Sequence, residues 1–588
     1  MMQNIKKFLF LLSLHERKRA ALLLIMMLIM ALLDMIGVAS ILPFMAVISN
    51  PEIIETNLIL NKIFQISKIF GVQDNQQFLL FLGILLLIIL VISISFKAFT
   101  TFLQMKFIQM RQYSIGKRLL EGCLHQPYSW FLNRNSSEVS KTILSEVAQV
   151  VGGIINPLMQ LITNSMITIA IISLLIIVNP VIAITVGFSV SFLYAIIFFY
   201  IRKYLNRIGK ERLDSNKFRF SIISEAFGAA KVIKVGGLEQ IYINQFSIFG
   251  KKFALNTAMS QILNLLPRYA LEILVFGSIM VLILNMMASS GNFNTLIPIL
   301  SLYLFAGYRL MPAIQKIYVT FATFTFNIPA LNKLYDEMFK VRSFNSNFDE
   351  GIISLNKSLI CKNISFSYSE TQRRVLDNVN LVIPAKSSVG FIGTTGSGKT
   401  TLVDIILGLF EPQNGTLEVD DLIITKQNKR AWQRSIGYVP QNIYLSDDTI
   451  ACNIAFGVDP KNIDQNLLKK VCNIANLKQF IESELPEKYQ TKVGERGIKL
   501  SGGQLQRIGI ARALYQNPKV LILDEATSAL DNETELKIMN NINNLEENIT
   551  IIIIAHRLNT VKNCDMIFKL ENGKIVDQGA FSQLINDS

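Results

Sequence analysis

The sequence predicts a chain of two parts, an all-α membrane region with six transmembrane helices followed by an α/β domain. Two observations predict this division. The 588-residue chain is 51% hydrophobic and only 17% charged, with its apolar residues concentrated before about residue 325, which is typical of a membrane protein. From about residue 354, short strand-like runs alternate with helical patterns. We therefore expect a membrane domain over 1–325, a linker over 326–353 and an α/β domain over 354–588.

Six segments in the first part each supply the roughly 20 apolar residues that a helix needs to cross a bilayer. They are 20–48, 78–106, 150–178, 180–201, 262–287 and 295–322. Soluble core helices are rarely this long and this apolar. The first segment has no small-residue cleavage site, which favours an uncleaved signal-anchor.

Basic residues mark the connections that stay in the cytoplasm. They gather before the first span and in the loops 107–149 and 202–258, whereas the turns at 179–180 and 288–294 carry no charge. This pattern predicts a multi-pass membrane protein with both termini cytoplasmic, and we expect the membrane to be the bacterial inner membrane. Most of the net charge of +14 is then explained by the membrane topology. The charge therefore no longer supports nucleic-acid binding.

Three further segments carry expectations of their own. The loops 107–149 and 202–258 are long enough for cytoplasmic helical extensions, which we expect to reverse at 125–135 and 224–234 and to contact a cytoplasmic domain. Residues 51–71 have apolar residues at helical spacing, which predicts an amphipathic helix on the outer face. Whether that helix lies in the membrane interface or is packed in a loop stays open.

A glycine-rich turn, "SSVGFIGTTGSGKT" over 387–400, follows a predicted strand and opens a helix. Glycine allows the backbone to approach a phosphate, whose oxygens accept hydrogen bonds from N–H groups at the helix N-terminus. Lys399 adds a point charge, and the Thr400 hydroxyl is placed to bind Mg²⁺. The motif predicts a P-loop NTPase fold with ATP and Mg²⁺ as its ligands. The candidate phosphate-binding residues are Gly393, Thr394, Thr395, Gly396, Ser397, Gly398, Lys399, Thr400 and Thr401.

A buried parallel strand is predicted in "VLILDEATSALD", 520–531, and it ends in two acidic residues. Asp524 is placed to hold Mg²⁺, directly or through water. Glu525 points elsewhere and is a candidate to orient or deprotonate the attacking water.

A second glycine-rich helix start lies between these motifs, in "LSGGQLQRIGIARAL" over 500–514. Ser501, Gly502 and Gly503 make it a possible anion site. One nucleotide needs only one cradle, so we expect this site to serve a nucleotide held by another copy in a head-to-tail dimer. The alternative is an ordinary helix cap.

Taken with "YVPQ", which ends at Gln441, and "IIIIAHRL", which contains His556, these motifs are similar to those of the ATP-binding cassette (ABC) domain over about 354–588. The resemblance implies that Tyr368 stacks on adenine and that His556 contacts the γ-phosphate. It also implies that Gln441 contacts both Mg²⁺ and the attacking water.

The same resemblance implies a dimer. Ser501, Gly503 and Gln504, with Gly502 between them, would close on the partner's γ-phosphate, and Asp531 would communicate across the interface. "VGERG", 493–497, resembles the segment that touches the membrane domain in exporters. With six preceding spans, the chain resembles an ABC exporter half-transporter. The family implies a homodimer that hydrolyses ATP at both sites and transports by alternating access.

Ionisable residues within the spans bear on the cargo, because each is costly at mid-bilayer, at least ~2.5 kcal/mol on insertion scales. They are Asp34, Lys97, Arg268, Glu272, Arg309 and Lys316. Arg268 and Glu272 are four residues apart and are placed to pair, and Asp34 is placed to neutralise one more cation. Two cations then remain, which favours an anionic cargo, and arginine suits phosphate. Ion pairing confined to the protein is the alternative.

The segments "LPRYALE", 266–272, "YRLMP", 308–312, and "YVPQNIYL", 438–445, are similar to PglK-type flippases of lipid-linked oligosaccharides, as is the outer amphipathic segment. The resemblance implies that cavity arginines hold the cargo's diphosphate, and Arg268 and Arg309 match them. Lys97 and Lys316 are further candidates. We therefore expect ATP-driven flipping of a polyprenyl-diphosphate-linked oligosaccharide to the outer leaflet, which requires guanidinium groups that protein acids leave free.

Other cargoes and other classes of protein compete with this hypothesis. One alternative is an exporter of another cargo, such as a lipid A-like glycolipid, a drug or a peptide. Another is an ATP-gated channel or regulator, against which Glu525 and the complete "LSGGQ" argue. The predicted spans exclude a soluble cassette protein acting on DNA or ribosomes.

Overall fold

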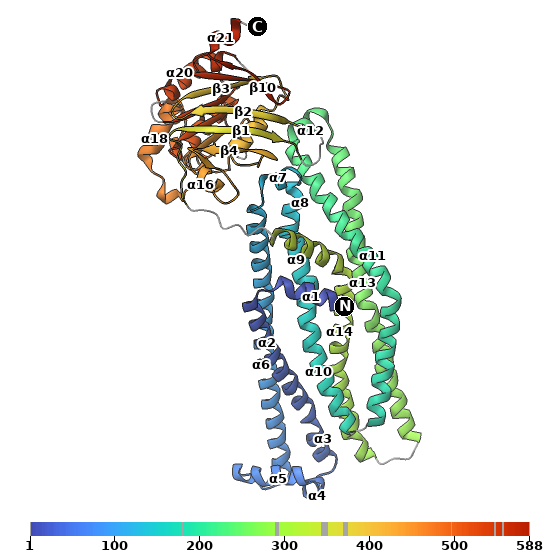
Figure 1. Ribbon diagram of the computed structural model, residues 1–588. Coiled ribbons are helices and arrows are strands. Elements are labelled where there is room, and N and C mark those ends of the chain that lie inside the picture. Colours follow the sequence, from blue (N-terminus) through green and yellow to red (C-terminus); the bar gives the residue numbers. More distant parts are fainter. Residues whose placement is uncertain are drawn as a thin grey trace. The chain divides into compact units, whose positions relative to one another are not determined.

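The structure is a computed structural model of the chain. It describes all residues except 1, 179, 289–292, 343–350, 369–373, 495–496, 546–548, 556–557 and 587–588. The chain forms two compact units (Figure 1). The helical unit contains residues 1–126 and 133–344, and the nucleotide unit contains residues 345–588 together with 127–132.

The helical unit is built from long helices joined by short turns. Its elements in chain order are α1 (Met2–Leu11), α2 (Leu14–Ala39), α3 (Ile41–Ser49), α4 (Ile53–Thr56), α5 (Leu58–Ser67), η1 (Lys68–Phe70), α6 (Asn75–Leu124), α8 (Ser136–Lys141), η2 (Thr142–Glu146), α9 (Val147–Val150), η3 (Val151–Ile155), α10 (Asn156–Val178), α11 (Pro180–Gly228), α12 (Ala230–Gly236), α13 (Glu239–Ala288) and α14 (Phe293–Arg342). Elements η2 and η3 are π-helical turns.

Within the described residues, four helical stretches are long and apolar enough to cross a membrane: Leu14–Ser49, Asn75–Leu124, Ser136–Val178 and Gly187–Gly228. Helices α13 and α14 cover the fifth and sixth predicted spans, although many of their side chains lie outside the described set. Helices α6, α13 and α14 have 50 residues each, or about 75 Å at 1.5 Å per residue. The hydrocarbon core is only about 30 Å thick, so these helices extend well beyond it.

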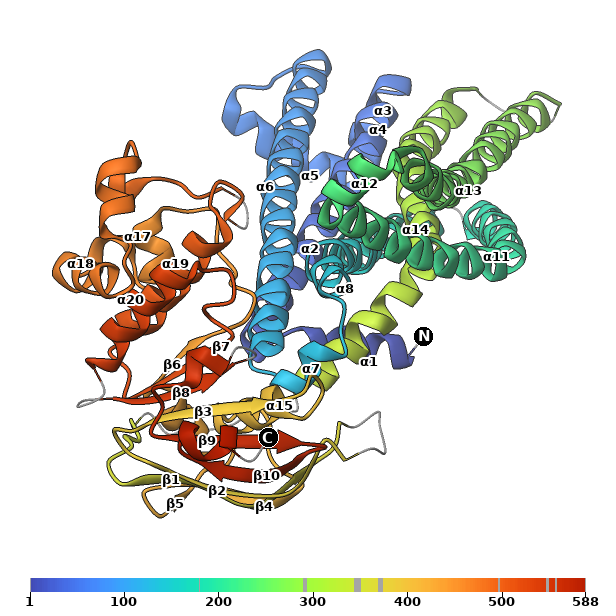
Figure 2. The same cartoon turned by 90° about the horizontal axis from the view of Figure 1, so that it is seen from above.

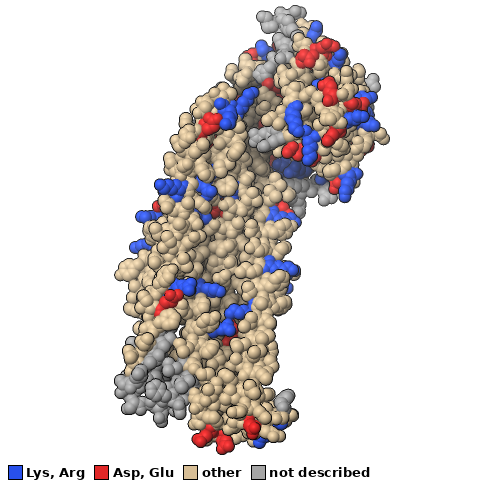
Figure 3. Space-filling view, turned by 180° about the vertical axis from the view of Figure 1, so that it is seen from behind, with Lys and Arg blue, Asp and Glu red and all other residues tan. Residues whose placement is uncertain are grey.

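Apolar faces at helical spacing hold the helical unit together. One buried cluster joins Met30, Ala31 and Val38 of α2 to Ile171 of α10 and Ala306 of α14. Elsewhere, exposed apolar side chains cover the long helices, and charged side chains are sparse over much of this surface (Figure 3). An exposed apolar belt is what lipid contact requires.

Helix α14 extends into the stretch predicted to be a linker, and it ends at Arg342. Leu331, Leu334, Met338 and Val341 are all buried there. Their spacing of three or four residues places them on one face, so packing continues the helix past residue 325.

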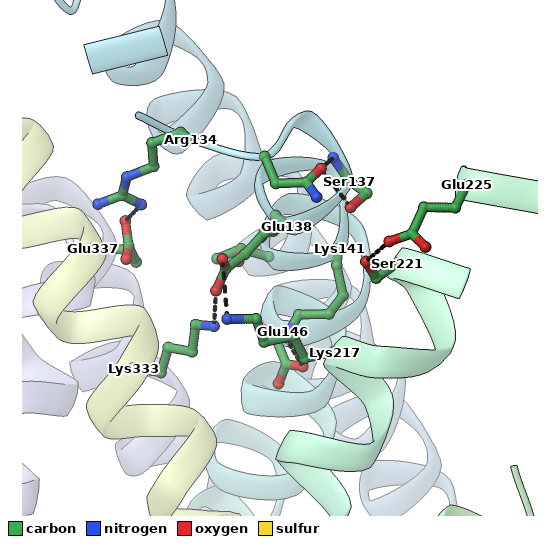
Figure 4. Close-up of polar contacts among 12 residues, drawn as sticks. Arg134, Ser137, Glu138, Lys141, Glu146, Lys217, Ser221, Glu225, Lys333 and Glu337 are labelled. Atoms are coloured by element: carbon green, nitrogen blue, oxygen red, sulfur yellow. Dashed lines mark hydrogen bonds and ion pairs between the residues drawn. The ribbon is translucent and has the colours of Figure 1, made fainter. Parts of the chain in front are cut away.

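A network of ion pairs joins α8, α11 and α14 within the helical unit (Figure 4). Glu138 accepts a hydrogen bond of 2.6 Å from Lys333 and lies 3.5 Å from the ammonium nitrogen of Lys217. Nearby, Lys141 and Glu146 form a 3.5 Å ion pair in which both side chains are 0% exposed. Lys141 is the last residue of α8, and Glu146 is the last residue of the π-helical turn η2 that follows it.

Residues 51–71 form two short helices and a 3₁₀ turn instead of one helix. Asn57 interrupts the stretch and caps α5 by accepting hydrogen bonds from the N–H groups of Ile59 and Leu60. Leu60 packs against Phe78 of α6, while Ile59 is exposed. The segment is therefore amphipathic, with one face docked on the start of α6.

The nucleotide unit contains two sheets. Its strands are β1 (Ser358–Phe366), β2 (Leu376–Pro384), β3 (Ser388–Gly393), β4 (Asn414–Val419), β5 (Leu422–Ile423), β6 (Ile436–Val439), β7 (Val520–Asp524), β8 (Thr550–Ile554), β9 (Met566–Glu571) and β10 (Lys574–Gly579). One sheet is antiparallel in the order β2-β1-β4-β5, and the other has the order β10-β9-β3-β8-β7-β6. Every residue of β7 and β8 is buried, as expected for central parallel strands covered on both faces.

The helices of this unit are α7 (Tyr128–Leu132), α15 (Lys399–Ile406), α16 (Lys429–Gln433), α17 (Ile450–Ile454), α18 (Gln465–Ile474), α19 (Gly502–Tyr515), α20 (Asn532–Asn543) and α21 (Phe581–Asn586), with short turns η4 (Pro460–Asn462), η5 (Phe480–Glu484), η6 (Lys488–Gln490) and η8 (Leu558–Val561). The register of the larger sheet positions the site. Phe391 of β3 and Asp524 of β7 both pair with Ile554 of β8 in parallel strands. The segments after these strands therefore leave the same edge of the sheet.

Candidate functional site

The glycine-rich turn connects β3 to α15 (Figure 2). Gly396 and Gly398 have φ angles of 82° and 105°, a region that favours glycine. A Cβ atom on Gly393 would lie 2.2 Å from the carbonyl oxygen of Leu570. No larger residue fits at Gly393 in this conformation.

The turn fits a phosphate-bearing ligand. Lys399 donates hydrogen bonds of 2.8 and 3.0 Å to the carbonyl oxygens of Gly393 and Thr394, so its ammonium group lies against the loop. Burial lowers the pKa of Lys399, and the charges of Glu525 and Asp524 oppose that shift. The Ser397 hydroxyl is buried and has no hydrogen-bond partner among the residues that the structure describes. Such an orphaned donor needs an acceptor, and a phosphate oxygen supplies one.

Two acidic residues follow β7 at the same edge of the sheet. Asp524 is buried and accepts a 3.4 Å hydrogen bond from the Tyr438 hydroxyl. Glu525 accepts a 2.9 Å hydrogen bond from the side-chain amide of Gln441. Thr400 lies in the first turn of α15, which follows β3 at the same edge of the sheet. Carboxylate, amide and hydroxyl oxygens are the ligands that Mg²⁺ prefers.

The backbone of Glu525 is strained. Its φ angle is 49°, a region that non-glycine residues seldom occupy and that is often found at active sites. The Glu525 N–H donates to the carbonyl oxygen of Ile554, and Gln506 donates to the Glu525 carbonyl oxygen. These contacts hold the residue in its strained conformation.

The second glycine-rich motif begins α19. Ser501 caps this helix by accepting from the Gln504 N–H, and the Gln504 side chain accepts from the Ser501 N–H. Gly502 and Gly503 pack against the loop after Glu525, where a Cβ atom would lie 3.3 Å from atoms of Ala529. The helix cap, one of the two alternatives for this motif, is therefore present, and a partner's phosphate would have to compete with it.

Three other predicted residues have different outcomes. The hydroxyl groups of Tyr368 and Thr401 form a hydrogen bond of 3.0 Å next to the glycine-rich turn. Asp531 caps α20, and its hydrogen bond from the Thr534 backbone lowers the pKa of its carboxyl. His556 lies outside the described residues, as do positions 495 and 496 of the "VGERG" segment.

The nucleotide unit also contains α7, from the first predicted loop reversal. The rings of Tyr128 in α7 and Phe410 are 5.7 Å apart, and the Phe410 ring lies 5.6 Å from that of Tyr368. Residues 127–132, from the middle of the predicted reversal, therefore belong to the nucleotide unit.

In the helical unit, one buried carboxylate lies close to cations from two other helices. Asp34 of α2 is 1% exposed and lies 3.2 Å from the Lys97 ammonium of α6 and 3.1 Å from the Arg309 guanidinium of α14. Ser93 donates a further hydrogen bond to Asp34 at 3.2 Å. We call Asp34, Ser93, Lys97 and Arg309 the Asp34 cluster.

Comparisons with known proteins identify both parts of the chain. Residues 376–528 match the family described as "ABC transporter", and residues 54–308 match the "ABC transporter transmembrane region". The chain belongs to the ABC transporter family. It is an exporter half-transporter, as the motifs predicted, so it hydrolyses ATP and couples hydrolysis to transport across the membrane that its helices span.

Several relatives of this exporter have names that state a function. An ATP-dependent lipid A-core flippase from Cupriavidus metallidurans is 28% identical over 485 residues, which span 80% of this chain and 78% of the relative. A multidrug resistance ABC transporter ATP-binding and permease protein from Lactococcus lactis is 27% identical over 80% and 79%. The structure of a bacterial Atm1-family ABC exporter with ATP bound has a TM-score of 0.76 at 21% identity over 97% and 96% of the two chains.

The expectation that cavity arginines are free for a phosphate is wrong. Arg309 is bonded to Asp34, and Arg268 is bonded at 2.8 Å to Glu272, one helical turn along α13. A buried or half-buried cation inside an apolar segment is stabilised by an acid within reach, and both arginines have one. Within the described chain, only Lys316 among the four candidate cations has no carboxylate within ion-pair distance, and its side chain is exposed.

Two positioning residues were missed from the sequence. Tyr438 donates a hydrogen bond to Asp524, and Gln506 donates one to the carbonyl oxygen of Glu525. Asp34 was expected to neutralise one cation, but it contacts two. Gln506 and Tyr438 both lie within motifs that were identified from the sequence, so those motifs could have indicated them. The partners of Asp34 lie 59 to 275 residues away, and no local pattern indicates which cations those are.

Proposed function

We propose that this exporter is a homodimeric flippase that moves a lipid with an anionic headgroup from the cytoplasmic to the outer leaflet of a bacterial inner membrane. The more specific proposal is a polyprenyl-diphosphate-linked oligosaccharide as cargo, bound by the N–H donors that Lys97 and Arg309 do not use on Asp34, because neither arginine is free of an acid. Both termini are cytoplasmic in this proposal, because the basic loops lie on that side.

The observation that carries the proposal is the charge of the Asp34 cluster. Two cations, Lys97 and Arg309, share one carboxylate, which leaves one uncompensated positive charge. Arginine has five N–H donors and lysine three, and each uses one on Asp34. Their side chains are 41% and 24% exposed for Lys97 and Arg309, so the remaining donors are accessible to an anion. Arg268 is excluded from this argument because Glu272 neutralises it.

The relatives support a lipid cargo without choosing the headgroup. Several are named as lipid A-core flippases and one as a multidrug protein. A cationic drug fits a net positive cluster poorly. Lipid A-core is therefore the second candidate, favoured by those relatives.

The nucleotide roles in this proposal follow from the residues at the edge of the larger sheet. The turn from Gly393 to Thr401 binds the phosphates, and Tyr368 stacks on adenine. Thr400, Gln441 and Asp524 would hold Mg²⁺, which neutralises phosphate charge when bound. Glu525 accepts a proton from the attacking water. In the dimer, Ser501, Gly502, Gly503 and Gln504 of one copy would close on the γ-phosphate held by the other. Asp531 would communicate across the interface, and His556 would contact the γ-phosphate.

The test is reconstitution of the purified protein in proteoliposomes with fluorescent lipids. We expect ATP-dependent movement of a polyprenyl-diphosphate glycan headgroup, absent with the Glu525→Gln variant and weaker for a neutral glycolipid of the same chain. Transport of lipid A-core in place of the diphosphate glycan would support the second candidate. Equal transport of neutral and anionic lipids would overturn the anionic-headgroup proposal.

A further inference from the structure

Asp34 occupies a strongly apolar site. It lies on the buried face of α2, three residues after Ala31 and four before Val38, both of which belong to the buried cluster with α10 and α14. Moving an ionised carboxylate into such surroundings is unfavourable unless cations and hydrogen bonds compensate it. The Asp34 carboxylate receives three hydrogen bonds, from Ser93, Lys97 and Arg309.

The compensation is larger than the carboxylate needs. One negative charge faces two positive charges, and one cation would already balance Asp34. The second cation leaves a net charge of +1 in a region of low dielectric constant, where a charge attracts a counter-ion strongly. Lys97 binds one carboxylate oxygen and Arg309 the other, so the two cations flank the same group.

We propose that Asp34 is a specificity-determining residue for the headgroup, and this rests on the anionic cargo proposed above. Asp34 holds Lys97 and Arg309 as a fixed pair and limits the cluster to one unit of positive charge. A lipid phosphate then binds on the accessible side of the two cations, where their unused donors lie. The same carboxylate keeps that affinity moderate, so that the headgroup is released after it crosses.

This proposal makes the charge of the cluster, and not the identity of any one side chain, the quantity that sets headgroup affinity. Asp34→Asn raises the net charge from +1 to +2, and Lys97→Gln lowers it to 0. The double variant restores +1. If Asp34 served only to pin three helices together, the double variant would be worse than either single one.

The experiment measures ATPase stimulation in phosphatidylcholine nanodiscs that contain increasing mole fractions of phosphatidic acid. We expect the half-stimulating fraction to fall about tenfold for Asp34→Asn, to rise about tenfold for Lys97→Gln and to return to near the wild-type value in the double variant. Asp34→Glu, which keeps the charge, and Ser93→Ala, which removes only a hydrogen bond, should change it less than about threefold.

Two further arms separate the sources of phosphate and the two proposals. Soluble glycerol phosphate should give no stimulation, because the apolar surroundings of the cluster favour a lipid. A neutral diacylglycerol series should not respond to the variants. If the wild-type protein does not distinguish phosphatidic acid from diacylglycerol, the anionic-cargo proposal fails.

If the wild-type protein prefers phosphatidic acid but its affinity does not follow the cluster charge, the role of Asp34 alone is overturned. Should Asp34→Asn fail to fold, Lys97→Gln decides the matter, because an unchanged half-stimulating fraction in that variant contradicts the proposal.

Discussion

The nucleotide site and the Asp34 cluster both gather charges, but they are built in opposite ways. The nucleotide site uses backbone groups and neighbouring side chains from short contiguous segments at one edge of a sheet. The Asp34 cluster uses single side chains from α2, α6 and α14, which lie up to 275 residues apart. The arrangement of the nucleotide site suits one kind of chemistry. In the Asp34 cluster, by contrast, a single substitution changes the net charge. ATP hydrolysis is therefore the constant part of this exporter, and the headgroup selection proposed above is the adjustable part.

The substitution Glu525→Gln gives the sharpest test of how this exporter hydrolyses ATP. This variant keeps the shape of the side chain and removes its ability to accept a proton, so ATP hydrolysis should fall about 10²- to 10⁴-fold. Nucleotide binding should persist, because the glycine-rich turn is untouched. Phosphate release and nucleotide binding would be measured on the same sample. Glu533→Gln, at an exposed position paired with Lys537 at the surface, is the matched control, and equal activity of the two variants would contradict the assignment.

The second prediction concerns the buried pair of Lys141 and Glu146 (Figure 4). Glu146→Gln leaves the Lys141 ammonium buried without this anion, and breaking a buried pair in this way costs about 3–5 kcal/mol. We expect a clear fall in the midpoint of thermal unfolding in nanodiscs. The comparison is Glu225→Gln, whose carboxylate is exposed and bonded to Ser221, and which should shift the midpoint little. Equal shifts would show that burial of the pair does not matter.

The third prediction concerns the net charge of the Asp34 cluster. Arg309→Ala removes one cation and leaves Asp34 with Lys97, so the cluster becomes neutral. The ratio of anionic-lipid-stimulated to unstimulated ATPase activity should fall about tenfold, by the loss of one charge contact. Arg268→Ala is the comparison, since its guanidinium is already neutralised by Glu272, and it should change the ratio less. A larger effect from Arg268 would move the cargo contact to α13.

The smallest predicted effect is a pH dependence in the nucleotide unit. Burial, together with the nearby charge of Asp524, raises the pKa of Asp404 to about 6. The folded state therefore binds this proton more tightly than the unfolded state, so its contribution to stability is present below pH ~4 and is lost as pH rises through about 6. Asp404→Asn should remove that loss. Thermal midpoints between pH 5 and 8 would show a flatter profile than the wild type, and Asp421→Asn, at an exposed position, should leave the profile unchanged.

The same contrast explains how much the sequence predicted. The glycine-rich turn, Asp524 and Glu525 were found because each motif is contiguous and the strands carry it to one edge. The membrane region was found because apolar runs of this length are rare in soluble proteins. The strained backbone of Glu525 required coordinates. The cap formed by Ser501 and Gln504 was one of two alternatives for its motif, and coordinates were needed to show that it is present.

The membrane charges were only half predicted. Arg268 and Glu272 were expected to pair because they lie one helical turn apart on the same chain segment. The sharing of Asp34 between Lys97 and Arg309 depends on how α2, α6 and α14 pack, and no local pattern encodes that. The buried Lys141–Glu146 pair is a similar case. Long-range pairing of charges is therefore the part of this protein that its sequence did not predict.

The most direct test of the central claim is a matched pair of fluorescent lipids that differ only by a headgroup phosphate, followed in the same proteoliposomes. The claim is that ATP hydrolysis drives anionic headgroups across because the Asp34 cluster carries one surplus positive charge. The account predicts ATP-dependent translocation several-fold faster for the phosphate lipid, with the difference abolished in Arg309→Ala. Equal rates for the two lipids in the wild-type protein would contradict it.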